Sequence, residues 1–147
     1  MEIMKKAIFI FLLSFAVCGL CFSQAGNSVN ITVEVTNIVI NGGKVYLAAF
    51  FSGESFRKEE PDMAVELQDD KTSIIKEVSL PRGEFVIFAF QDANNNKKLD
   101  NGLLGIPKEK IGISNYFGKG YPSRNFDKQK ILINERTGKI VLGLYHF

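Results

Sequence analysis

The segment from residue 92 to residue 100 carries oxygen-bearing side chains at alternate positions, with the spacing of a calcium-binding loop. Ca²⁺ prefers a shell of oxygen ligands, which such loops supply from positions 1, 3, 5 and 9 and from the main-chain carbonyl at position 7. The side chains at positions 1, 3, 5 and 9 belong to Asp92, Asn94, Asn96 and Asp100. The carbonyl of Lys98 falls at position 7. The spacing therefore predicts a Ca²⁺ site.

The same loop departs from the calcium pattern in three ways. Lys97 stands where Gly normally makes the sharp turn, and Leu103 stands where a carboxylate normally binds through both oxygens. Lys97 and Lys98 also offset the charge of the two aspartates. If the bend at 105–107 brings Glu109 back to supply the missing carboxylate, we expect a weak affinity, about 10⁻⁴–10⁻³ M. The alternative is a loop held without metal by hydrogen bonds from its own side chains to its backbone.

Residues suited to catalysis are few. His146 is the one His in the chain, so a His-rich metal site and a paired-His site are both excluded. A Ser-His-Asp triad would use Ser114 or Ser123, but neither lies in a nucleophile elbow. Asp92 and Asp100 are better explained as cation ligands or loop stabilisers than as the acid pair of a glycosidase. The sequence therefore predicts no catalytic residue.

Aromatic residues in the segment 110–127 are the other candidates for chemistry. Tyr116 and Tyr121 lie among Asn, Gly and Lys, a composition typical of adaptable binding surfaces for proteins or sugars. We therefore expect these two tyrosines to contact a partner. We expect Phe117 and Phe126 to fold inward and cover one end of the core.

The elements that position these residues are predicted to be β-strands. Alternation of apolar and polar residues or continuous apolar runs, bounded by turn signals, predict strands at 30–40, 44–51, 72–80, 84–90, 128–133 and 139–145. We expect the last two to form a hairpin across 134–138. The segment 63–68 is either an edge strand or a short helical turn. No amphipathic helix is predicted. About seven strands and one long loop, 91–127, indicate an all-β fold, an antiparallel β-sandwich of the transthyretin-like or immunoglobulin-like kind.

Composition and charge narrow the function classes. The chain has 147 residues, of which 46% are hydrophobic and 23% charged, and its net charge is +2. A charge so close to zero does not indicate a nucleic-acid-binding protein. Residues 92–130 contain eight Lys or Arg and four Asp or Glu, a local charge of +4. The long loop is therefore predicted to form a mildly basic surface.

The N-terminal segment has the layout of a secretory signal peptide. Lys5 and Lys6 precede a nearly unbroken apolar run at 7–22, and small or polar residues follow. We expect a signal peptide at 1–23 and a single mature β-sandwich domain at 24–147, which contains no Cys and no transmembrane span. An uncleaved anchor is the alternative.

Two cysteines inside the apolar run raise the question of lipid attachment. Val17 precedes Cys18 and Leu20 precedes Cys21, whereas lipid attachment generally needs a small residue before the Cys. We therefore expect export without a lipid anchor. An intact mass of the exported protein would reveal an acyl chain.

The chain from about residue 31 to residue 147 resembles a family of small secreted bacterial proteins known as domain of unknown function 2141. The residues that carry the resemblance are, in order, Leu80-Pro81-x-Gly83-x-Phe85, Asp92-x-Asn94-x-Asn96-x-x-Leu99-Asp100, Gly105-Ile106-Pro107-x-Glu109, Gly112-x-Ser114-Asn115 and Phe126-Asp127. The sequence departs from the family pattern at Lys97, where the family tends to have Gly. It departs also at Ile113 and Tyr116, where the family tends to have Phe and Asn. The resemblance implies an exported β-sandwich with no established activity.

Together these features predict an exported, periplasmic, secreted or surface-associated module that binds a partner or serves a structural role. The expected partner is a protein or carbohydrate of the cell envelope, and Ca²⁺ is the one expected cofactor. A hydrolase that acts on the cell envelope through the loops at 92–127 is the alternative.

Overall fold

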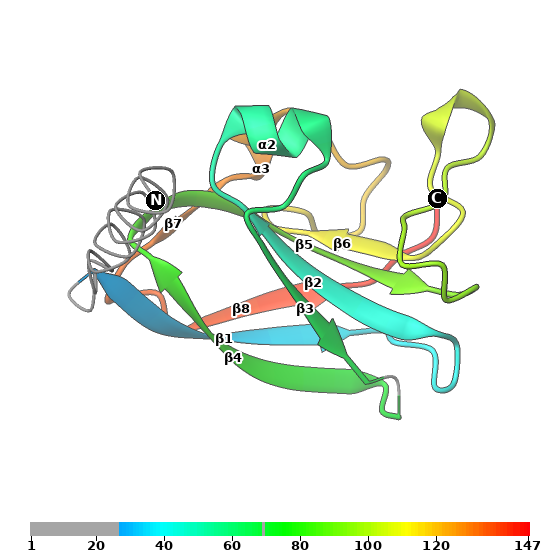
Figure 1. Ribbon diagram of the computed structural model, residues 1–147, viewed down its shortest axis with the longest axis horizontal. Coiled ribbons are helices and arrows are strands. Elements are labelled where there is room, and N and C mark those ends of the chain that lie inside the picture. Colours follow the sequence, from blue (N-terminus) through cyan, green and yellow to red (C-terminus); the bar gives the residue numbers. More distant parts are fainter. Residues whose placement is uncertain (1–26, 69) are drawn as a thin grey trace, which may run out of the picture.

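Two β-sheets packed face to face form the core of the computed structural model, which describes residues 27–68 and 70–147 (Figure 1). The predicted signal peptide lies outside the described residues. One sheet has the order β4-β1-β8; the other has the order β3-β2-β5-β6, and β7 pairs with β5. The strands are β1 (Ser28–Thr36), β2 (Lys44–Phe50), β3 (Met63–Leu67), β4 (Ser73–Pro81), β5 (Gly83–Asp92), β6 (Ile111–Ile113), β7 (Ile131–Ile133) and β8 (Lys139–Gly143). The predicted β-sandwich is confirmed, with one parallel pair, β1 with β8.

Alternation along β1 shows how the core is built. Ile31, Val33 and Val35 are buried between the sheets, while the intervening polar residues face outward. A strand with this period-two pattern buries one face and leaves the other in water. Val33 and Val35 pack in the larger of two core clusters, which fills the space between the sheets.

The strands β2 and β5 are apolar on both faces. Leu47 and Ile87 point into the core between the sheets. Phe50 and Val86 belong to a second cluster, on the outer face of the sheet. The apolar residues of these two strands therefore supply both clusters, one on each face of the sheet, as expected for central strands.

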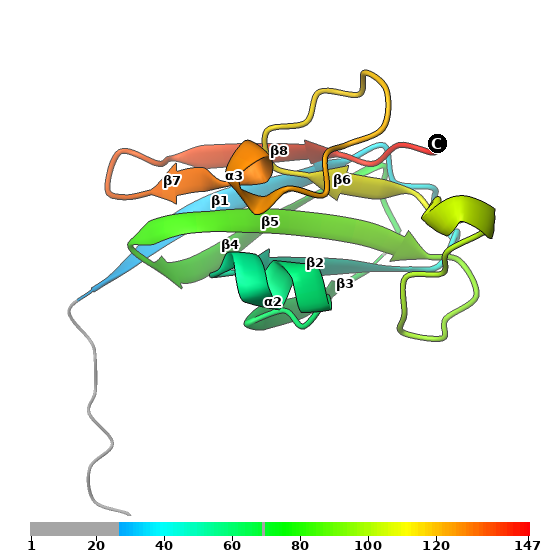
Figure 2. The ribbon, with the colours of Figure 1, turned by 90° about the horizontal axis from the view of Figure 1, so that it is seen from above.

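Two short helices and one 3-10 turn lie outside the strands. They are α2 (Gly53–Lys58), α3 (Phe126–Gln129) and η1 (Leu103–Gly105). The hydroxyl of Ser52 accepts a hydrogen bond from the N–H of Ser55 and so caps α2, and Asn125 caps α3 by accepting from the N–H of Asp127. Figure 2 shows the two helices on either side of the β5 ribbon, and Phe56 and Phe126 from them pack on the outer face of its sheet. Among the described residues, no helix is long and apolar enough to span a membrane.

The predicted terminal hairpin is wrong. β7 pairs with β5 in one sheet, whereas β8 pairs with β1 in the other. The turn between them, closed by a hydrogen bond from the N–H of Thr137 to the carbonyl of Asn134, carries the chain from one layer to the other. Ile133 and Leu142 can then enter the core from opposite sides, and both are almost fully buried.

Candidate binding groove and its supporting loop

The outer face of the β2–β5 sheet is only partly covered. Near Phe50 and Val86, side chains of the two helices pack on it: Phe56 from α2 and Phe126 from α3. Phe56 lies with its ring centroid 5.3 Å from that of Phe50 and 6.2 Å from that of Phe126. The other half of this face, toward the ends of the strands at Lys44 and Asp92, has no helix over it.

This uncovered half is the floor of a groove of about 610 Å³. Tyr46 and Phe90 are direct cross-strand partners, and their rings stack with centroids 5.2 Å apart and planes 22° apart. Phe88 continues the aromatic floor, with its ring centroid 6.2 Å from that of Phe90. The walls are Leu99 and Pro107 from the long loop, Tyr121 and Pro122 from the segment before α3, and residues of α2 and β3. The floor and much of the walls are therefore apolar.

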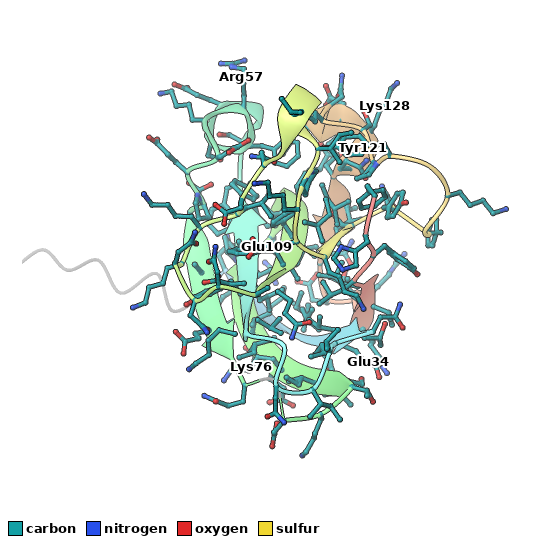
Figure 3. The ribbon with its side chains drawn as sticks, turned by 90° about the vertical axis from the view of Figure 1, so that its right-hand side faces the viewer. Glu34, Arg57, Lys76, Glu109, Tyr121 and Lys128 are labelled. Atoms are coloured by element: carbon teal, nitrogen blue, oxygen red, sulfur yellow. The ribbon has the colours of Figure 1, made fainter. Side chains whose placement is uncertain are left out.

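Basic side chains lie around this apolar interior. The cations of the lining are Arg57, Lys97, Lys98 and Arg124, whereas Glu59 is its one acid. None of the four cations makes an ion pair with another described residue. Figure 3 shows Arg57 and Tyr121 toward the same end of the molecule, away from Glu34 and Lys76. With four cations and one acid, the rim carries a net positive charge.

One of the two predicted partner-binding tyrosines lies in this groove. Tyr121 lines the wall and is 45% exposed; its hydroxyl donates to the carbonyl of Gly105 over 3.5 Å. Tyr116 does not line the groove. It packs between Tyr145 and Phe147, its hydroxyl donates to the carbonyl of Gly120, and burial raises its pKa.

The two phenylalanines of this segment differ from each other. Phe126 packs against the outer core cluster, as predicted. The prediction for Phe117 is wrong, because its side chain is 84% exposed. Phe126 lies on α3, which docks on the sheet beside α2, whereas Phe117 lies in a turn with Gly118 and Gly120 at positive φ. The turn directs Phe117 away from the core.

Two buried carboxylates hold the loop between β5 and β6 from within. Asp92 is 0% exposed and accepts hydrogen bonds from the N–H groups of Asn96 and Lys97, at 3.2 and 2.6 Å. Glu109 is 4% exposed and accepts from Ala93 at 2.9 Å and from Asp100 at 3.1 Å. The loop is therefore closed by side chains that satisfy backbone donors, because unpaired buried donors are costly.

The remaining predicted ligands also bond to one another. The Nδ2 atoms of Asn94 and Asn96 donate to the same oxygen of Asp100, at 2.6 and 3.0 Å. Their Oδ1 atoms accept from the N–H groups of Asn96 and Lys98, at 3.1 and 2.8 Å. A cation beside Asp100 would therefore need both amides to rotate, and these two N–H groups would lose their acceptors. The donor set shown here fits the hydrogen-bonded alternative, and Ca²⁺ binding stays a prediction from the spacing.

Lys97 adopts a backbone conformation that few residue types favour. Its φ is 64°, in the left-handed region that costs a non-glycine residue about 1–2 kcal/mol. The loop requires this turn so that the N–H of Lys97 reaches Asp92. This explains why Gly is expected at the position, and it places a cationic side chain on the groove rim.

The structure does not bring together the residues considered for a catalytic triad. His146 lines a different, shallow polar cavity that includes Lys110 and Tyr145. Ser123 lines the groove. Ser114 is buried; its hydroxyl donates to the carbonyl of Gln129 over 2.6 Å and accepts from the N–H of Ile87.

Sequence reasoning missed the floor of the groove. Tyr46 and Phe90 are half-buried, outward-facing members of the central strands β2 and β5. Tyr46 donates a hydrogen bond of 3.3 Å to Glu66, and its pKa is raised, first by burial and then by the charge of Glu66. Large aromatic residues at outward positions of a strand, next to a long basic loop, were the signal that could have located the site.

The comparisons with known proteins give one match. A family model described as "Uncharacterized protein conserved in bacteria (DUF2141)" matches residues 33–141. The matched range extends from β1 into β8 and includes all the residues of the groove. No curated protein and no solved structure matches the chain.

Proposed function

The chain belongs to the DUF2141 family of bacterial proteins, and we propose that it is a binding protein for small anionic amphiphiles, which it holds in the groove on the outer face of β2 and β5. The observation that carries this proposal is the combination of an aromatic floor with four rim cations that make no ion pair with another described residue. The aromatic floor would hold the apolar body of a ligand, and the rim cations would hold its anionic head.

The size and chemistry of the groove support an apolar body. Ligand sites of proteins usually have volumes of about 300–1,000 Å³ and mostly apolar walls with a few polar groups. The stacked rings of Tyr46 and Phe90 give a flat floor on which an alkyl chain or an aromatic ring loses contact with water. A carbohydrate would need hydrogen-bonding side chains along the floor, where the lining has mainly carbon atoms.

The charge of the rim supports an anionic head. Arg57 extends from α2, Lys97 and Lys98 from the long loop, and Arg124 from the segment before α3. Cations from three segments surround one opening, so an anion there would be attracted from several sides. Glu59 is the one opposing charge of the lining, and α2 ends there.

Export is part of the same proposal. The basic, apolar and small-residue order of residues 1–23 supports processing to a domain that starts near Gln24. The intact mass of protein recovered from the cell envelope or the medium tests this step. A mass that includes residues 1–23 would contradict cleavage, and an added acyl mass would contradict export without a lipid anchor.

Three probes separate the features that the groove is proposed to recognise. Octyl sulfate has the chain and the negative charge, octyl glucoside has the chain and a neutral sugar, and glucuronate has a charged sugar without the chain. In calorimetric titrations below micelle formation, we expect octyl sulfate to bind best and glucuronate not to bind. Equal affinity for octyl sulfate and octyl glucoside would contradict the role of the rim, and preference for glucuronate would favour a carbohydrate-binding function.

Matched variants locate the binding. Phe90→Ala removes the centre of the floor and should weaken octyl sulfate about tenfold or more, as expected for one large apolar contact. Arg124→Gln should weaken it about two- to fivefold, the range of an exposed ion pair. Arg136→Gln is the control, because Arg136 is exposed and lies on the turn between β7 and β8, outside the groove.

A further inference from the structure

The two most exposed large apolar side chains among the described residues stand on neighbouring loops. Leu103, in η1, is 93% exposed, and Phe117, in the turn after β6, is 84% exposed. Single exposed apolar residues are common on protein surfaces, but contiguous ones mark interaction sites. The contacts between the two loops therefore bear on whether Leu103 and Phe117 can act together in an interaction.

Contacts at the base of the two loops connect them. Tyr121 and Arg124 both donate to the carbonyl of Gly105, at 3.5 and 3.1 Å, and so tie the second loop to the first. The ring of Tyr121 lies 5.3 Å from that of Phe147. The exposed apolar side chains of these loops and of the C-terminus, here called the loop-tip patch, are Leu103, Ile106, Phe117, Tyr121 and Phe147, each at least 37% exposed.

The tips of these loops carry basic residues and no acidic ones. The segments 101–107 and 114–125 contain no Asp or Glu, whereas Lys119 and Arg124 belong to the second segment and Lys108 follows the first. Lys119 lies two residues after Phe117, between glycines that have positive φ. The side chain of Lys108 approaches Gly102, next to Leu103. Each exposed apolar tip thus has a basic side chain close to it.

From this arrangement we infer that the loop-tip patch docks the protein on an anionic lipid surface. Apolar and aromatic side chains enter the boundary between headgroups and acyl chains, while nearby Lys and Arg contact anionic headgroups. The acid-free tips at 101–107 and 114–125 carry no charge that such a surface would repel. Tyr121 belongs to both the patch and the groove wall, so the groove would open beside the lipid surface.

The test is flotation of the processed protein, with its first residue defined by mass, on vesicles. Two kinds of vesicle are compared: phosphatidylcholine alone, and phosphatidylcholine with about one third phosphatidylglycerol. We expect binding to the second kind, and a loss of binding when salt shortens the screening length from about 10 Å to below about 5 Å. Leu103→Ser and Phe117→Ser should each weaken binding about tenfold, because each removes one apolar side chain from the contact.

A control variant tests whether vesicle binding depends on the loop-tip patch. Leu132→Ser removes a side chain that is 59% exposed on β7, away from the patch, and should leave binding unchanged. Equal loss in this variant, absence of vesicle binding, or a patch-dependent dimer in light scattering would each overturn the inference. The groove proposal is tested separately by octyl sulfate, whose binding should survive Leu103→Ser and Phe117→Ser but not Phe90→Ala.

Discussion

The backbone N–H of Lys97 donates a hydrogen bond of 2.6 Å to the fully buried carboxylate of Asp92, and it does so from a left-handed conformation with φ of 64°. One turn of the chain thereby closes the loop around a buried anion and also places a cation on the rim of the groove. The backbone strain at Lys97 is thus linked to the position of a cation that the proposed function uses.

The first prediction separates the strain at Lys97 from its charge. Lys97→Gly should raise the free energy of unfolding by about 0.5–1 kcal/mol, because relief of the left-handed conformation outweighs the greater flexibility of unfolded Gly. Lys97→Ala removes the same charge but keeps the strain, so it should not stabilise. Both variants should bind octyl sulfate about two- to fivefold more weakly. Urea unfolding and calorimetry measure the two effects, and a destabilised glycine variant would refute the strain argument.

The second prediction concerns the two buried carboxylates of the loop. Asp92→Asn and Glu109→Gln should each lower the free energy of unfolding by about 1–3 kcal/mol, because an amide nitrogen replaces one acceptor and leaves a backbone donor unpaired. Glu60→Gln serves as the control, since Glu60 is exposed and makes no ion pair with another described residue. The urea concentration at the midpoint of unfolding, compared among the three variants and the wild type, measures the loss of stability. If both loop variants unfold like this control, the carboxylates do not support the loop.

The third prediction decides between the two interpretations of the Asp/Asn loop. A calcium site with a Kd of about 1 mM would add about 1 kcal/mol at about 5 mM Ca²⁺, which corresponds to roughly 3–6 °C in Tm. Because the loop side chains already satisfy one another, we expect a smaller shift than this. A shift of that size in the wild type that disappears in Asp100→Asn would instead establish the metal site and imply rotation of Asn94 and Asn96.

The fourth prediction is a pH dependence at the outer face of the other sheet. Glu34 on β1 pairs with Lys139 of β8 over 2.7 Å and accepts from Ser73 of β4 over 3.0 Å, and these hydrogen bonds lower its pKa. A carboxyl with a lowered folded pKa stabilises the fold above its unfolded value, near 4.5, and this contribution is lost as the pH falls through the folded pKa.

Glu34→Gln should therefore lower Tm at pH 7, and the difference from the wild type should shrink as the pH falls below 4.5. Thermal unfolding at a series of pH values measures this difference. Glu77→Gln, on the exposed face of β4, is the matched control. A deficit that stays constant down to the most acidic condition would show that the charge of Glu34 is not its cause.

Strand positions were predictable because local patterns determine them. The alternation around Val33 appears as a half-buried strand, and the turn at 41–43 uses the residue types that tolerate positive φ, as Asn41 and Gly43 do. The partner of β7 was not predictable in the same way. A turn such as 134–138 has the same local chemistry whether the chain returns beside itself or crosses to the other layer.

The groove was harder to predict from the sequence, because its floor is formed by strands that are far apart along the chain. Tyr46 and Phe90 are 44 residues apart, and only the register of β2 and β5 makes them neighbours. Tyr121 was chosen for its loop composition and does line the groove, but the same reasoning also selected Tyr116, which packs elsewhere. Composition indicated which residue types suit a binding surface, whereas the contacts determine which of them form one.

The most direct test of the binding groove is a titration of the ¹⁵N-labelled protein with octyl sulfate, followed by two-dimensional amide NMR. The account predicts progressive shifts for backbone amides of the groove, such as those of Tyr46, Phe90 and Tyr121, with little change along β1 and β4. Shifts confined to other surfaces, or a spectrum that does not change below the micellar concentration, would contradict it.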